Sequence, residues 1–239
     1  MKLISPVKHS AILVAGYLLL SSCETEEVER TSANVAVEAT ASPLTAAESQ
    51  QGRIVLTDFR INMKEVEFEF DKADARSATE VSVKDVKLKG PFELDLLNPN
   101  GSLSAIAATV VLPNAVYEQV GFKTHKGTSG VMLDKAVLMA GNVDGVPFEF
   151  WHDMDEEFDV DFADANQDLV VNGHDQALTI DYKISTLLGT ASGVDLSAAR
   201  DGNGDGRIEI SPKDTDGNQE LAKDLRDSLR SAIKLMDDK

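Results

Sequence analysis

Alternation of apolar and polar residues, repeated along most of the chain, constrains its fold more than any other feature. Apolar side chains alternate with aspartates over residues 158–162, and with Thr179, Asp181 and Lys183 over residues 178–184. Side chains of a β-strand point to opposite faces of a sheet in turn, so this period predicts strands with one buried face. Further strands are expected at residues 61–70, 81–88, 92–96, 109–112, 120–124, 131–139 and 146–151.

Turn-forming residues separate these runs. Glycine combines with asparagine, aspartate, serine or threonine at residues 98–101, 127–130, 142–145 and 172–173. About eight to ten strands at this spacing predict a mainly β fold, an antiparallel β-sandwich over residues 52–190. A slip in the phase of the alternation near Lys64 and Glu65 indicates a β-bulge.

The end of the chain, residues 191–239, has a different pattern. A short helix is expected over residues 195–200, and a longer one where apolar residues recur at helical spacing, at Leu221, Leu225, Leu229, Ile233 and Met236. This stripe predicts an amphipathic helix of roughly 18 residues that packs on the edge of the sandwich. A helix that binds a partner protein is the alternative.

The N-terminus has the features of an export signal. Lys2 and Lys8 precede an apolar run over residues 11–20, which is too short to span a bilayer but suits a signal peptide. The run ends in Leu20-Ser21-Ser22-Cys23, which resembles the bacterial lipobox. This resemblance implies that residues 1–22 are removed and that lipidated Cys23 holds the protein to a membrane; an ordinary signal peptide is the alternative.

Residues 23–51 contain mainly Glu, Thr, Ala and Ser and few large apolar side chains. Such a segment buries too little surface to offset the entropy of ordering, so a flexible acidic tether is expected. Its first residues include Glu24, Glu26, Glu27 and Glu29, a cluster that resembles the surface-export signal of Bacteroidota-type lipoproteins. The resemblance implies a location at the outer membrane or cell surface. A merely solvated tether is the alternative.

The acidic composition excludes some partners. Forty-one acidic against 23 basic side chains give a net charge of −18, whereas nucleic-acid binding needs a basic face. Cys23 is the one cysteine, so once it is lipidated no thiol remains for a disulfide or a thiolate metal site. An acidic surface is compatible with divalent cations.

The stretch from residue 201 to residue 209, Asp-Gly-Asn-Gly-Asp-Gly-Arg-Ile-Glu, has an oxygen-bearing side chain at every second position and a glycine after the third. Alternate side chains of a tight turn point inward, and oxygen ligands favour calcium over zinc or copper. The stretch resembles an EF-hand or dockerin-type calcium loop. That resemblance implies side-chain ligands at Asp201, Asn203 and Asp205, the backbone carbonyl of Arg207, and Glu209 through a water molecule.

The loop departs from this pattern at Pro212, which replaces the acid that usually completes the calcium shell. We expect Asp214 to close the shell instead, with Asp216 as a possible further ligand and Asn218 as the cap of the last helix. Asp201→Ala and Asp214→Ala are then expected to lower stability equally, and only with calcium present. The alternative is a turn without metal, because Asp, Gly and Asn favour turns by themselves.

A second acidic cluster begins at Asp153, Asp155 and Glu157 and continues to Asp168, with His152 and His174 at its two ends. Much of it alternates with apolar residues and is expected to be the solvated face of a strand. A second cation site is the alternative.

The layout from residue 53 to the loop resembles a group of uncharacterised Bacteroidota-type lipoproteins, through the segments ELDLL (residues 93–97) and VVLPNAVYEQVGFK (residues 110–123). The resemblance implies a β-sandwich lipoprotein and transfers no catalytic residues. Residues 127–131, Gly-Thr-Ser-Gly-Val, lack the closing glycine of a nucleophile elbow.

The sequence therefore predicts a non-enzymatic, lipid-anchored cell-envelope protein with a structural calcium ion. It would act as a binding or adhesion module for a glycan or protein ligand. The alternatives are a carbohydrate-binding accessory lipoprotein and a hydrolase that uses paired carboxylates.

Overall fold

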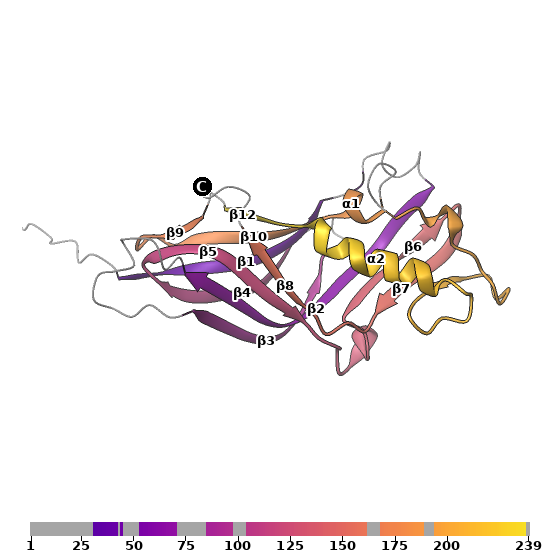
Figure 1. Cartoon of the computed structure of the whole chain (residues 1–239), viewed down its shortest axis with the longest axis horizontal. Helices are drawn as coiled ribbons and strands as arrows, with labels where there is room; N and C mark the ends of the chain where they lie inside the picture. The colour runs from indigo at the N-terminus through magenta and orange to yellow at the C-terminus, as the bar shows by residue number, and fades with distance from the viewer. Residues whose placement is uncertain are drawn as a thin grey trace, which may run out of the picture.

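The computed structural model describes residues 31–42, 44, 53–70, 85–97, 104–161, 168–188 and 194–237. This part of the chain is mainly β, with two sheets in a sandwich-like arrangement and two α-helices (Figure 1). The mainly β class expected from the alternation is confirmed. Both sheets are mixed rather than antiparallel throughout, because β1 pairs parallel to β10 and β11 pairs parallel to β7.

The smaller sheet has four strands in the order β12-β10-β1-β4. These are β12 (Ile233–Asp237), β10 (Gln176–Lys183), β1 (Ser32–Ser42) and β4 (Ser104–Pro113). Strand β1 has a partner on each side, β10 and β4, and is therefore internal.

The larger sheet follows the order β11-β7-β6-β2-β5-β8, with β3 also paired to β2 and β9 to β5. Its strands are β2 (Ile54–Phe70), β3 (Val86–Asp95), β5 (Ala115–Thr124), β6 (Val137–Val143), β7 (Val146–His152), β8 (Glu157–Asp161), β9 (Leu169–Val171) and β11 (Ile208–Ile210).

Strand β2 is long enough to take two partners in succession along one edge. Residues 54–61 pair with β6 and residues 63–70 pair with β5, while β3 pairs with residues 60–68. Because β3 faces both segments, β5 and β6 lie one after the other along the opposite edge of β2. The predicted bulge is confirmed, since the register shifts between Met63 and Glu65.

One continuous core joins the sheets and helices. Tyr182 of β10 contacts two rings of the larger sheet, Phe59 and Phe122, at centroid distances of 5.9 and 6.4 Å. Helix α2 (Gln219–Ala232) extends across the β6–β7 half of the molecule (Figure 1). It buries the apolar stripe at Leu225 and Leu229. The short helix α1 (Ile184–Leu188) directly continues β10.

The expected tether over residues 23–51 is wrong for residues 32–42, which form β1. Val35, Val37 and Ala39 are fully buried there. These side chains are small, but they occupy every second position, and pairing on both edges places that face of β1 in the core while the other face stays partly exposed. Residues 23–30, 43 and 45–52 lie outside the described residues, as do the signal peptide and residues 81–84 of the strand expected at residues 81–88.

Three other expectations need correction. Residues 131–139 are not one strand: a 3-10 turn, η2 (Gly130–Met132), precedes β6, with Met132 buried and Val131 exposed. The terminal helix ends at Ala232, and the chain continues as β12 because Ile233 and Leu235 pair with the free edge of β10. The short helix expected over residues 195–200 is a 3-10 turn, η4 (Leu196–Ala198).

Candidate functional site

The C-terminal loop, residues 201–218, lies between η4 and α2 and is fixed to the larger sheet by β11. Ile208 and Ile210 are buried beneath it. Gly206 has a φ of 90°, a value that side-chain-bearing residues rarely adopt, so glycine is required at this turn.

The first part of the loop folds around its own side-chain oxygens. The Asp201 carboxylate accepts hydrogen bonds from the backbone N–H groups of residues 204–206, at 2.7, 3.0 and 2.7 Å. Asn203 Oδ1 accepts from the Asp205 N–H and Asp205 Oδ1 from the Arg207 N–H, both at 2.9 Å. The side chains of Asp201, Asn203 and Asp205, which the sequence predicted to face a cation, therefore point toward the backbone of the same loop.

Asp216 connects the first part of the loop to β11. Its side chain is only 3% exposed. One carboxylate oxygen accepts from the Asn203 N–H at 3.1 Å, and the other accepts from the Glu209 N–H at 2.7 Å. Each oxygen thus has one hydrogen bond from the backbone and keeps a second lone pair.

Asp214, the residue expected to close the calcium shell, has a different role in the structure. Its Oδ1 accepts from the N–H groups of residues 216–218 at 3.0, 2.8 and 3.0 Å, and its Oδ2 accepts from the Ser211 N–H at 3.1 Å. The buried carboxylate therefore organises the turn that begins α2, and Oδ1 has little capacity left for a cation.

Asn218 precedes α2 as expected, but the prediction that its side chain caps the helix is wrong. Its Oδ1 accepts from the Arg200 N–H at 3.2 Å, and its Nδ2 donates to the carbonyls of Arg200 and Glu209 at 2.8 and 2.7 Å. Asn218 therefore joins Arg200, before the loop, to Glu209 of β11, and Asp214 supplies the acceptor near the helix N-terminus.

The acids of the loop have no cationic partner among the residues that the structure describes. Asp201, Asp205, Asp214 and Asp216 form no ion pair there. The guanidinium of Arg207 turns away from them to Glu149 on β7. The described part of the chain also gathers no group of three or more His, Cys, Asp or Glu side chains that could hold a metal ion.

Several acids of the second acidic cluster contact basic side chains: Glu157 lies 3.4 Å from Lys123, and Asp155 lies 3.7 Å from His125. Asp153 contacts Lys126 and Lys213 at 3.3 and 3.0 Å. Burial acts to raise the pKa of Asp153, but hydrogen bonds from these two lysines outweigh it, so the pKa is lowered. Glu156 pairs with Arg226 of α2. These contacts give the cluster a structural explanation without a second cation.

The two histidines at the ends of this cluster differ in their surroundings. His174 is exposed. The Nδ1 of His152 is buried without a hydrogen-bond partner among the described residues, and the nearest carboxylate oxygen of Asp153 is 4.0 Å away. Burial lowers the pKa of His152 and outweighs the opposing effect of Asp153, so the neutral imidazole is favoured in the folded protein.

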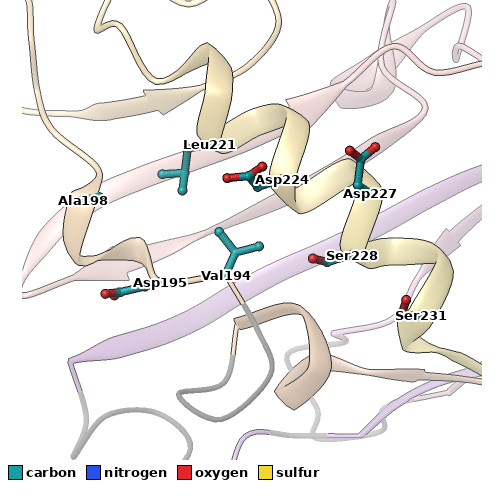
Figure 2. Close-up of a pocket in the computed structure, with 8 residues that line it drawn as sticks. All are labelled: Val194, Asp195, Ala198, Leu221, Asp224, Asp227, Ser228 and Ser231. Atoms are coloured by element: carbon teal, nitrogen blue, oxygen red, sulfur yellow. The ribbon is translucent and has the colours of Figure 1, made fainter.

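An open groove of about 570 Å³ lies between residues 194–198 and α2. In Figure 2 the side chains of Val194, from the first segment, and Leu221, from α2, extend into the space between the two segments. Asp224 and Asp227 lie along the helix. Sequence reasoning did not identify this groove, because the helix pattern alone does not show which segment packs beside it.

Aromatic side chains do not form an exposed platform in the described part of the chain. Tyr117 and Tyr182 are fully buried. Trp151 is half-buried, and the Lys213 ammonium lies 5.8 Å from its ring centroid. Sugar binding by stacking needs an open aromatic face, so these positions do not favour the carbohydrate-binding alternative.

Comparison with protein-family models, with curated proteins and with solved structures found no match to this chain. Among the described residues, no helix has the length and apolar character needed to cross a bilayer. Cys23, the expected lipidation site, lies outside the described residues.

Proposed function

We propose that this protein is a lipid-anchored component of the bacterial cell envelope, with a non-catalytic binding or adhesion role and a structural calcium ion in its C-terminal loop. The observation that carries the calcium proposal is the unpaired charge of Asp216. A carboxylate that is 3% exposed and has no cationic partner in the described structure is costly unless a cation compensates it.

The composition of the loop agrees with this proposal. Asp201, Asn203, Asp205 and Asp216 would supply side-chain oxygens, Arg207 its backbone carbonyl, and Glu209 a ligand through water. Asp216 replaces Asp214 as the acid that completes the shell, because each of its oxygens has a lone pair free. Calcium would draw these groups closer together and would join β11 to the start of α2.

The membrane anchor is supported by the sequence pattern alone, an apolar run that ends at Cys23. Lipid chains attached to this residue would hold the domain at a membrane surface. The corresponding test is incorporation of labelled palmitate into the wild-type protein and its loss in Cys23→Ser.

Calcium is expected to raise the melting temperature of the protein. At a calcium concentration about 100 times the Kd, binding to the folded state alone adds about 2.7 kcal/mol to the free energy of unfolding. For a domain of this size this corresponds to a rise of roughly 5–10 °C. Differential scanning calorimetry in calcium and in EDTA measures the difference.

Asp201→Asn and Asp216→Asn should each remove most of this rise. Asp224→Asn is the matched control, because it removes the same charge from an exposed position on α2 outside the loop. If the wild-type melting temperature is the same in calcium and in EDTA, the calcium proposal is wrong, whatever the palmitate experiment gives.

A further inference from the structure

A cavity of about 300 Å³ lies where β2 changes its partner from β6 to β5. At this point Asn62 contacts the chain at both ends of the 125–136 connection. Its N–H donates to the Ala136 carbonyl at 2.8 Å, and its side-chain Nδ2 donates to the His125 carbonyl at 2.8 Å. The chain between these residues leaves the sheet and forms one wall of the cavity.

The opposite wall of the cavity is formed where both β2 and β3 depart from regular strand pairing. The register pairs Met63 with Phe92 and Glu65 with Lys89, so Lys64 on one strand and residues 90–91 on the other fall outside the ladder. A Cβ at Gly90 would approach the Met63 carbonyl oxygen to 2.6 Å, so glycine is needed for the strands to come this close. The resulting gap in the sheet is part of the fold and does not depend on a mobile side chain.

The lining of this cavity has more lysines than acids, whereas the protein as a whole is acidic. Lys64 and Lys126 line it together with one acid, Glu93, and His125 lies there with its Nδ1 3.7 Å from Asp155. The Glu93 carboxylate lies 3.5 Å from the guanidinium of Arg60, which partly neutralises it. Lys126 contacts Asp153, whereas Lys64 is exposed and has no ion pair among the described residues. Lys64 is therefore free to meet an anion.

Hydroxyl groups complete the lining. Thr128 and Ser129 are exposed at the edge of the cavity, and the described contacts include no hydrogen bond from either side chain. Pro91 adds an apolar surface. The volume is at the lower end of the range for small-molecule sites, and a lysine with nearby hydroxyls suits a small carboxylate that itself carries hydroxyl groups.

We propose that this cavity, named here the switch-point cavity, binds a small hydroxylated carboxylate such as a sugar acid. Lys64 pairs with the carboxylate, and Thr128 and Ser129 hydrogen-bond to the ligand hydroxyls. None of the residues that line the cavity belongs to the C-terminal loop, so binding is expected without calcium.

The test is a titration of the whole protein with D-glucuronate in EDTA, followed by calorimetry or by NMR chemical shifts. EDTA removes any contribution from calcium that bridges the sugar acid to the loop. We expect saturable binding of glucuronate and at least tenfold weaker binding of D-glucose, which has the same ring and no carboxylate. Lys64→Gln should weaken glucuronate binding at least tenfold, because a charged partner is lost.

Lys234→Gln is the matched control, since it removes the same charge from an exposed position on β12 in the other sheet. It should leave the affinity for glucuronate unchanged. Three results would overturn the proposal: no saturable binding of glucuronate, equal affinity for glucose and glucuronate, or equal losses in Lys64→Gln and Lys234→Gln. Unchanged melting temperatures of both variants would show that the loss in Lys64→Gln does not come from unfolding.

Discussion

Val37→Asp is expected to destabilise the protein severely. Val37 is fully buried in β1, where its neighbours in the register are Leu178 of β10 and Ala108 of β4. An aspartate there would bury a charge without a partner, which belongs to the substitutions that cost more than about 4 kcal/mol. Because domains are stable by only about 5–15 kcal/mol, most of this stability would be lost. Urea denaturation followed by far-UV circular dichroism measures the change.

Val111→Asp is the control for this substitution. Val111 is on β4, beside β1, but its side chain is 61% exposed. The same change of chemistry should alter the free energy of unfolding by only about 0.5 kcal/mol, as is usual at the surface. Equal and small effects of the two substitutions would mean that residues 32–42 do not belong to the core and that the tether interpretation holds.

Asp214→Ala is expected to destabilise the protein by roughly 2–4 kcal/mol, in EDTA as well as in calcium. The substitution removes the acceptor of four backbone N–H groups at a side chain that is 6% exposed. Donors left without an acceptor in a buried position cost free energy whether or not a metal ion is bound. Chemical denaturation under both conditions measures the loss.

Asp201→Ala provides the comparison. Its three N–H donors, residues 204–206, are exposed, and water can replace the carboxylate there. We therefore expect a smaller effect than that of Asp214→Ala in EDTA, and an additional loss when calcium is present. This differs from the equal, calcium-dependent effects expected from the sequence. A silent Asp214→Ala in EDTA would contradict the structural role assigned to this carboxylate.

The fold could be predicted from the sequence where one strand face is polar and the other has large apolar groups. The strands expected at residues 158–162 and 178–184 are of this kind, and the bulge near Lys64 could be read from the break in such an alternation. Strand β1 was missed because its buried residues are alanine and valine, whose apolar area is small. Their burial depends on β4 and β10, which are distant in sequence, and no local pattern reports such pairing.

The terminal segment shows the same limit. Leu225 and Leu229 follow the helical period and are buried in α2, whereas Ile233 fits both that period and the alternation of a strand. The free edge of β10 decides between the two, since β12 completes the smaller sheet there. Tertiary pairing therefore ends the helix earlier than its periodicity suggests.

In the C-terminal loop, residue types predicted the conformation better than the roles of individual acids. The inward-facing pattern of Asp201, Asn203 and Asp205 follows from the spacing of short polar side chains and glycine. The division of roles between Asp214 and Asp216 does not, because both are aspartates in the same short run. Only the geometry distinguishes them. Asp214 accepts hydrogen bonds from four N–H groups within a single turn, whereas Asp216 accepts from Asn203 and Glu209.

The early start of β1 has a further consequence if Cys23 is the point of lipidation. Nine residue steps separate Cys23 from Ser32, and a fully extended chain of that length spans at most roughly 30 Å. The beginning of β1, next to Pro113 of β4, would therefore stay close to the bilayer, within about the thickness of a small domain. The C-terminal loop lies at the other end of the elongated molecule (Figure 1), so it would face away from the membrane.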